Sequence, residues 1–182
     1  MSEQTAILAG GCFWCLEPVF SQLQGVKRVI SGYIGGQTLN PTYKQVCNGD
    51  TGHAEAIRID YDPEQIAFEA LLEIFFVAHD PTTPNRQGHD IGTQYRSAVF
   101  CQNETQRQAV QDMIVRLDQQ RLWPDPIVTQ INGADTFYPA EDYHQYYYIN
   151  NQRQPYCMAV ARPKIDKVRA HYAARIKDDI GY

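Results

Sequence analysis

The sequence has no apolar run that approaches the roughly 20 residues a helix needs to cross a lipid bilayer. It also starts without the basic segment and the long apolar segment of a signal peptide, so we expect a cytoplasmic protein. An excess of basic residues is missing too: 16 lysines and arginines stand against 21 acidic residues, giving a net charge of −5. This balance argues against a surface for nucleic acid or for an anionic membrane.

The cysteines do not form the pattern of a disulfide-stabilised protein. There are five, an odd number, and without a secretion signal we expect reduced thiols. The length of 182 residues suits one domain over residues 1–182, which can bury a core without cross-links. A hydrophobic content of 43% with 20% charged residues is typical of a globular domain.

Hydrophobic periodicity predicts strands and helices in a defined order. Apolar residues that alternate or run together predict strands at 5–9, 26–34, 53–61, 95–101 and 127–131. Helical spacing predicts helices at 12–23, 62–76, 103–117, 140–149 and 164–177. Residues 37–52 and 80–94 read as loops, with one helical turn near 43–47, and the second loop is long enough to suggest a function. The order β-α-β-β-α-β predicts an α+β sandwich of the ferredoxin-like, split βαβ type, with long loops and a C-terminal extension.

Two cysteines three positions apart, Cys12 and Cys15, follow a glycine pair at the end of the first predicted strand. If a helix begins near Cys12, unpaired backbone N–H groups and the helix dipole favour an anion there and lower the pKa of the thiol. Four roles fit such a pair: buried packing, metal binding, thioredoxin-type dithiol exchange, and reduction of an oxidised sulfur. A structural zinc needs four ligands, and only Cys47 and His53 are further candidates, so we expect no metal site.

One acid and two phenols bear on the choice between the last two roles. In strand 53–61, Glu55 shares a face with Ile57 and Ile59, which is the expected core face. Burial on that face favours the neutral carboxyl, which can donate a proton, whereas a place at the wet end of the strand leaves it ionised. Tyr43 and Tyr95 border the two predicted loops and either line a cleft or pack within the fold. Such extra groups favour reduction of an oxidised sulfur over simple dithiol exchange.

These candidates lie within six short motifs: Gly10-Gly-Cys-Phe-Trp14, Asn40-Pro-Thr-Tyr43, Thr51-Gly-His-Ala-Glu55, Gln87-Gly-His-Asp90, Gly92-Thr-Gln-Tyr-Arg-Ser97 and Tyr143-His144-Gln145. In content and order the set resembles the A-type peptide methionine sulfoxide reductases. The resemblance covers about residues 5–157, and residues 158–182 form a tail outside the motifs.

The resemblance implies a role for each candidate in reducing methionine S-sulfoxide, free or in oxidised proteins, as protein repair under oxidative stress. Cys12 is then the nucleophile that attacks the sulfoxide sulfur, and Glu55 is the acid that protonates its oxygen. Tyr43 and Tyr95 hydrogen-bond this oxygen, as donors do in an oxyanion hole. The family pattern further implies that Asp90 orients the substrate, and that a pocket for the substrate methyl group is formed by Phe13 and Trp14.

The resemblance also implies how the enzyme is recycled. Cys12 becomes a sulfenic acid, which a second thiol condenses to a disulfide that thioredoxin then reduces. The expected second thiol is Cys157, where many members carry a recycling cysteine on a mobile C-terminal segment. Cys15 stands where other members have glycine, and it is an alternative or an additional relay. We expect a monomer that needs no bound cofactor.

The remaining polar candidates receive structural interpretations. His53, His89 and His144 are expected to be hydrogen-bonding neighbours, because a thiolate at a helix end needs no histidine base. Cys47 and Cys101 are expected to pack, as are the tyrosines at 143, 146, 147 and 148. Two alternative functions stay open at this point: a general dithiol–disulfide oxidoreductase that uses Cys12 and Cys15, and a zinc-stabilised interaction domain.

Overall fold

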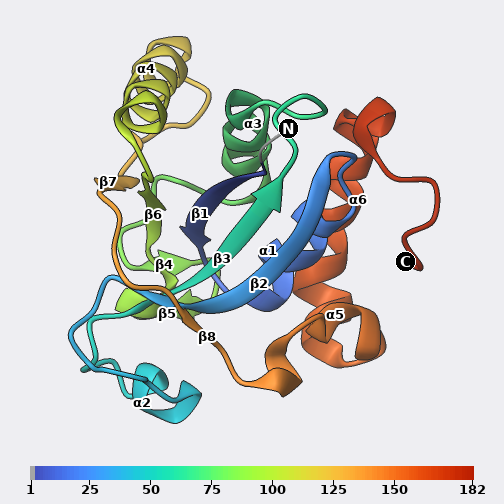
Figure 1. The fold of residues 1–182 in the computed structure, drawn as a ribbon. Helices are drawn as coiled ribbons and strands as arrows, with labels where there is room; N and C mark the ends of the chain where they lie inside the picture. The colour runs from blue at the N-terminus through green and yellow to red at the C-terminus, as the bar shows by residue number, and fades with distance from the viewer. Residues whose placement is uncertain (1–2) are drawn as a thin grey trace.

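The computed structural model describes residues 3–182, and a six-stranded sheet forms their centre (Figure 1). The strands lie in the order β7-β6-β1-β3-β2-β8, and neighbours are antiparallel except β6 and β7, which are parallel. The strand bounds are β1 Gln4–Gly10, β2 Val26–Ile34, β3 Ala54–Tyr61, β6 Ser97–Phe100, β7 Gln130–Asn132 and β8 Tyr138–Pro139.

The helices lie around this sheet, with α1 and α3 on one face and α6 packed against both (Figure 1). Their bounds are α1 Phe13–Ser21, α2 Tyr43–Cys47, α3 Phe68–Ala78, α4 Glu104–Gln120, α5 Tyr147–Asn150 and α6 Arg162–His171. Shorter helical turns span Thr93–Tyr95, Asp142–His144, Cys157–Ala161 and Ala173–Arg175.

The central part of the molecule confirms the predicted ferredoxin-like, split βαβ fold. Its elements follow the order β1-α1-β2-β3-α3-β6, and the corresponding strands pair in the order β6-β1-β3-β2. The first strand of each strand–helix–strand unit therefore lies in the middle of the sheet, as the fold requires. The fold is α+β, with β7 and β8 added at the two edges.

Several predicted boundaries are shifted in the structure. The strand predicted to start at residue 95 starts at Ser97, because Tyr95 closes a 3₁₀ turn through a backbone hydrogen bond to Gly92. The loop at 80–94 contains a small hairpin of β4 Arg86–Gln87 and β5 Asp90–Ile91. The terminal helix ends at His171, not at residue 177, and β7 starts three residues later than predicted.

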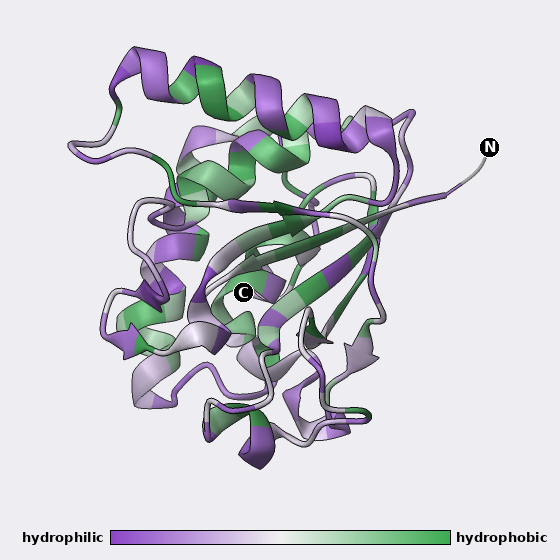
Figure 2. Cartoon of the chain, turned by 90° about the vertical axis from the view of Figure 1, so that its left-hand side faces the viewer, coloured by the Kyte–Doolittle hydropathy of each residue, from purple (hydrophilic) through white to green (hydrophobic). Residues whose placement is uncertain are grey.

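Side-chain alternation along the strands divides the core into two parts. In β1, Ala6 and Leu8 belong to the large cluster under the helices, whereas Ile7 and Ala9 belong to a smaller cluster on the opposite face. Phe137 packs against the smaller cluster. Figure 2 shows green, hydrophobic strands inside the molecule and mostly purple, hydrophilic turns on the outer side of α4. The burial of both sheet faces explains why the strands contain few exposed positions.

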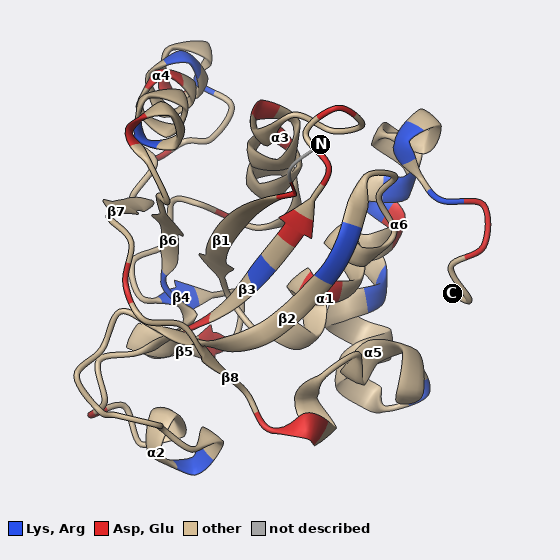
Figure 3. Ribbon diagram, viewed as in Figure 1, with Lys and Arg blue, Asp and Glu red and all other residues tan. Residues whose placement is uncertain are grey.

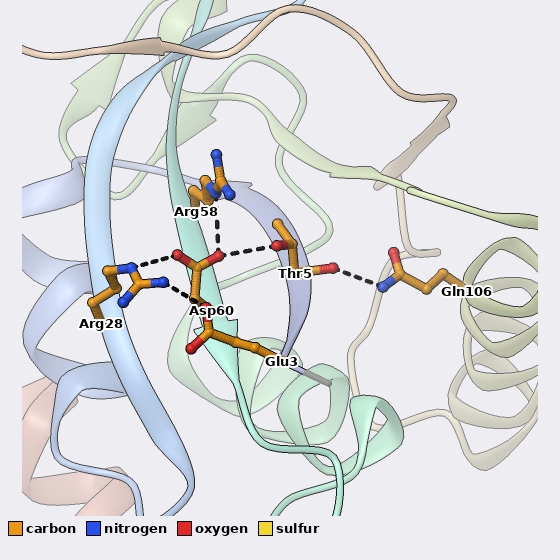
Figure 4. A network of polar contacts seen from close by, with 6 residues as sticks. All are labelled: Glu3, Thr5, Arg28, Arg58, Asp60 and Gln106. Carbon is orange, nitrogen blue, oxygen red and sulfur yellow. Dashed lines mark hydrogen bonds and ion pairs between the residues drawn. The ribbon is translucent and has the colours of Figure 1, made fainter. Parts of the chain in front are cut away.

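Asp60 is a buried acid with a structural function. Its carboxylate accepts hydrogen bonds from Thr5 Oγ1 at 2.9 Å and from Arg28 Nε at 2.7 Å, and Arg58 Nε lies 3.2 Å away (Figure 4). Arg58 and Asp60 share the sheet face opposite Glu55, as alternation predicts. The two arginines and Thr5 compensate the buried charge of Asp60. The network also links β1, β2 and β3 at the end of the sheet away from Cys12.

The C-terminal residues beyond 157 pack onto the domain. Ile165 and Val168 of α6 are fully buried in the large cluster. Lys177 Nζ donates to the backbone oxygens of Ser21 and Val26, and Tyr182 donates to the oxygen of Pro18. Basic and acidic residues are interspersed across the elements (Figure 3). Across residues 3–182, the helices are too short or too polar to cross a membrane.

Candidate active site

Cys12 lies at the junction of β1 and α1, where the glycine pair lets the chain turn in a crowded space. Gly11 has a φ of +95°, and a Cβ atom there would lie 2.8 Å from the Gln87 side chain. At Gly10 a Cβ atom would lie 2.9 Å from the Phe75 ring. Cys12 is the N-cap of α1, and its backbone oxygen accepts the N–H of Cys15 at 3.0 Å. The thiol is half-buried at the start of this helix.

Glu55 is buried beside the first turn of α1. It lies on β3, faces the helices as alternation predicts, and is 1% exposed. Its Oε1 accepts the backbone N–H of Phe13 at 3.2 Å. Burial raises the pKa of Glu55 to about 8, and among the smaller influences is a hydrogen bond with the Cys12 side chain. The carboxyl is therefore largely neutral near pH 7 and shares one site with Cys12.

The expected effect of the helix end on Cys12 is outweighed. Burial raises the pKa of Cys12 well above its usual range, and hydrogen bonding with Cys15 and the nearby charge of Glu55 act in the same direction. The backbone of Trp14 at the helix end lowers this pKa, but by less. The prediction of a lowered pKa was wrong because the thiol is desolvated beside an acid, and desolvation disfavours a thiolate.

Tyr43, at the start of α2, and Tyr95, at the end of the turn Thr93–Tyr95, both lie within the electrostatic reach of Glu55. Burial raises the pKa of both phenols, and the nearby Glu55 charge is a further cause for each. Both hydroxyls are therefore protonated near neutral pH and can donate hydrogen bonds. Tyr43 is held by its backbone N–H, which donates to Glu141 Oε2 at 2.8 Å, and by its ring, which lies 4.4 Å from that of His144.

Asp90 reaches the site from the β4–β5 hairpin. The Tyr156 hydroxyl donates a short hydrogen bond to Asp90 Oδ2. The hydroxyl oxygen of Tyr156 in turn accepts a hydrogen bond from the Cys15 sulfur at 3.6 Å. The charge of Asp90 is also one of the smaller causes that raise the pKa of Glu55, after burial. The hairpin thus places its acid beside the thiol-bearing helix.

Phe13 and Trp14 take different positions although they are adjacent. Phe13 is fully buried, with its ring 5.8 Å from that of Tyr33 and 5.1 Å from that of His144. Trp14 is only half-buried and stacks on Tyr147 at 3.8 Å, nearly parallel at 8°. The Trp14 indole N–H donates to Nδ1 of His144 at 3.0 Å, which fixes the ring plane. An apolar wall thus stands next to Cys12.

Comparison with known proteins agrees with this geometry. The family model described as peptide methionine sulfoxide reductase matches residues 4–176. The chain belongs to this family. The match extends beyond the motifs and includes α6, which the sequence motifs alone left in a tail.

Bacterial relatives support the A type of this family. The peptide methionine sulfoxide reductase MsrA of Erwinia tasmaniensis is 56% identical over 175 residues, covering 96% of this chain and 97% of the relative. That of Chromobacterium violaceum is 55% identical over 170 residues, covering 93% and 97%. Such identity over nearly the full length shows that this chain is a methionine sulfoxide reductase.

Solved structures of the family share the fold. Reduced Mxr1 from Saccharomyces cerevisiae superposes with a TM-score of 0.80 at 34% identity, covering 85% of this chain and 89% of the yeast chain. Methionine sulfoxide reductase A of Corynebacterium diphtheriae gives a TM-score of 0.73 at 36% identity, covering 82% and 76%.

All five cysteines of this reductase are free thiols, in three kinds of environment. Cys15, Cys101 and Cys157 are buried, and for Cys101 this confirms the predicted packing role. Cys47 is exposed at the end of α2, so its predicted packing role was wrong. Cys157 lies in a π-helical turn inside the large hydrophobic cluster.

The histidines near the site make structural hydrogen bonds. Nδ1 of His53 accepts the N–H of Gly36 at 3.0 Å, and its Nε2 lies 2.7 Å from the oxygen of Thr38. His144 accepts from Trp14, whereas His89 is exposed. Within residues 3–182, His, Cys, Asp and Glu form no cluster of three or more that is suited to a metal ion.

Three residues that position the site were missed by the sequence analysis. Glu141 binds the N–H of Tyr43 and the hydroxyl of Tyr33, Tyr147 stacks on Trp14, and Tyr156 joins Cys15 to Asp90. All three come from residues 138–156, where the sequence suggested only a short packing helix. Since their contacts span about a hundred residues, no local pattern of the sequence could identify them.

Proposed function

We propose that this enzyme reduces the S-sulfoxide of methionine, free or within oxidised proteins, through Cys12 and Glu55. The observation that carries the proposal is the shared site of the two groups, a half-buried thiol beside a buried acid whose pKa is raised to about 8. Reduction of a sulfoxide needs both a sulfur nucleophile and a proton for the departing oxygen. A neutral carboxyl supplies that proton near pH 7.

The reaction begins with attack of the Cys12 sulfur on the sulfoxide sulfur. Glu55 gives its proton to the sulfoxide oxygen while the Cys12 thiol proton replaces it on the carboxylate, so no uncompensated charge remains buried. The S–O bond of the substrate and the new S–S bond then break as the protonated oxygen passes to the Cys12 sulfur, so Cys12 becomes a sulfenic acid and methionine leaves as the thioether. In this balance one thiol and one sulfoxide become one sulfenic acid and one thioether. The raised pKa of Cys12 in the free enzyme requires that the proton moves in the substrate complex.

The proposed substrate contacts follow from the groups around this pair. Tyr43 and Tyr95 donate hydrogen bonds to the sulfoxide oxygen, since both phenols are protonated and lie near Glu55. Trp14 and Phe13 form the apolar wall for the methyl group, and Asp90 at the rim orients the substrate. A methyl group on one side and an oxygen on the other define the handedness of the sulfoxide, which supports selection of one epimer.

The proposed recycling uses thiols of this chain and an external dithiol protein. The sulfenic acid condenses to an intramolecular disulfide, and Cys157 takes part in the recycling as the family pattern implies. We propose thioredoxin as the reductant, since yeast Mxr1 has also been solved in complex with Trx2. We place the reaction in the cytoplasm, because five free thiols are stable in a reducing compartment. The enzyme acts there as a monomer in repair of oxidised proteins.

Turnover of a racemic sulfoxide tests this proposal directly. With methionine sulfoxide of both epimers and a thioredoxin system, the enzyme should consume half of the substrate and leave the R form. Cys12→Ser should abolish the reaction, and Cys101→Ser is the matched control, because that thiol is buried away from the site. Normal turnover by Cys12→Ser, or complete consumption of both epimers, would contradict the proposal.

A further inference from the structure

Tyr156 connects the second cysteine of the pair to an acid across the site. Its hydroxyl donates to Asp90 Oδ2 and lies 3.6 Å from the Cys15 sulfur. Because the phenol proton points to Asp90, the lone pairs of the hydroxyl oxygen are left to accept from the Cys15 thiol. The S–H group of Cys15 is thus held in one direction.

Cys15 is also the thiol next to Cys12. The two residues lie one helical turn apart, with the N–H of Cys15 bonded to the oxygen of Cys12 at 3.0 Å. Hydrogen bonding between the two side chains contributes to the pKa of each thiol, raising that of Cys12 after burial and lowering that of Cys15. In this arrangement Cys15 lies one helical turn from Cys12 and influences the pKa of the sulfur that becomes oxidised.

Cys157 is covered by the large hydrophobic cluster. It is fully buried, and burial followed by the nearby Cys15 raises its pKa to about 11. Cys15 is thus a cause of the raised pKa of both Cys12 and Cys157. A direct bond from Cys157 to Cys12 would need the turn Cys157–Ala161 to leave its place in the large cluster.

We propose that Cys15 is the thiol that first closes a disulfide with oxidised Cys12, and that Tyr156, held by Asp90, is the positioning residue for this step. The inference rests on the proposed function, which supplies the sulfenic acid. The Cys15 sulfur attacks the Cys12 sulfur, the S–S bond forms as the S–O bond breaks, and the sulfenic hydroxyl leaves with the Cys15 thiol proton as one molecule of water. Any later transfer to Cys157 is a thiol–disulfide exchange that needs no further oxidant.

A single turnover without reductant tests the order of the thiols. Excess methionine sulfoxide is mixed with the enzyme, methionine is counted, and disulfides and a dimedone-trapped sulfenic acid are mapped by mass spectrometry. Cys157→Ser should accumulate the Cys12–Cys15 disulfide at the rate of the native enzyme. Cys15→Ser should still form one methionine per chain but keep the sulfenic acid, with disulfide formation slowed at least tenfold. Cys101→Ser is the matched thiol control.

The outcomes separate this inference from the proposed function. A Cys12–Cys157 disulfide that forms in Cys15→Ser as fast as in the native enzyme overturns the inference, while one methionine per chain still supports the reductase chemistry. If no methionine forms even in the native enzyme, the proposed function itself fails.

Tyr156→Phe tests the positioning role. Phenylalanine keeps the ring, which meets Trp14 edge-on at 6.0 Å, and removes only the hydroxyl. We expect disulfide formation to slow about tenfold, with an altered pH profile, while each chain still yields one methionine. A merely structural Tyr156 would leave both the rate and the pH profile of disulfide formation as in the native enzyme, and that result overturns its assignment.

Discussion

The backbone N–H of Phe13 donates a hydrogen bond to Oε1 of Glu55 at 3.2 Å, which joins the first turn of α1 to the start of β3. These residues are 42 positions apart in the chain, yet this contact places the carboxyl beside the thiol that precedes Phe13. The N–H group is one of the donors that a helix start leaves without an intrahelical partner. One hydrogen bond thus satisfies a helix end and anchors the catalytic acid.

Glu55→Gln should remove most of the sulfoxide reduction. Glutamine retains the size of the side chain and an oxygen for the Phe13 N–H but has no acidic proton, so the single-turnover rate should fall roughly 100-fold or more. In the native enzyme this rate should decline as pH rises above about 8, because the acid is then ionised. Glu17→Gln is the matched control, since Glu17 is an equally buried carboxyl of α1. An unchanged rate in Glu55→Gln would refute the acid role.

The same substitution should make Cys12 easier to ionise. The charge of Glu55 is one of the causes that raise the pKa of Cys12, after burial and hydrogen bonding with Cys15. Without that charge, alkylation of Cys12 by iodoacetamide should shift to lower pH, as measured by peptide mapping over a pH series. Native Cys12 should react slowly at pH 7. Equal alkylation curves for native enzyme and Glu55→Gln would show that the acid exerts no field on the thiol.

Removal of either phenol hydroxyl should slow the chemical step. Tyr95→Phe and Tyr43→Phe each delete one proposed donor to the sulfoxide oxygen, so kcat should fall by up to about 100-fold with a smaller change in KM. Because the pKa of both phenols is raised by burial, neither group should titrate in the pH profile between about 6 and 10. Steady-state kinetics with free methionine sulfoxide provide the measurement, with Tyr138→Phe as the control. If KM rises while kcat stays unchanged, the phenols contribute to substrate binding alone.

Glu17 should make the stability of the protein depend on pH. Burial raises the pKa of Glu17 to about 7, against an ordinary value of 4.5, so between these pH values the folded state binds more protons than the unfolded state. The contribution of Glu17 to the free energy of unfolding should therefore fall as pH rises through this window, by about 3 kcal/mol.

Urea denaturation at about pH 5 and about pH 8 measures this effect. Glu17→Gln should have a flatter pH dependence than the native enzyme, whereas the exposed Glu64→Gln should keep the native one. If the free energy of unfolding of the native enzyme rises over the same range, the buried carboxyl does not control it.

Hydrophobic periodicity alone predicts the order of the elements and the face on which Glu55 lies. Strand alternation has a period of two, so a carboxyl two residues before Ile57 must join the face that Ile57 buries. Their place beside the two predicted loops also indicated Tyr43 and Tyr95, whereas Asp90 was indicated only by the resemblance to the family.

Only the tertiary structure decided the chemistry of the thiols. The pKa of Cys12 depends on what covers it, and here desolvation outweighs the helix end that the sequence made visible. The burial of Cys157 and the bridge from Cys15 through Tyr156 to Asp90 likewise join segments far apart in the chain. Periodicity is a property of neighbouring residues, whereas burial and hydrogen bonding sum contributions from distant ones.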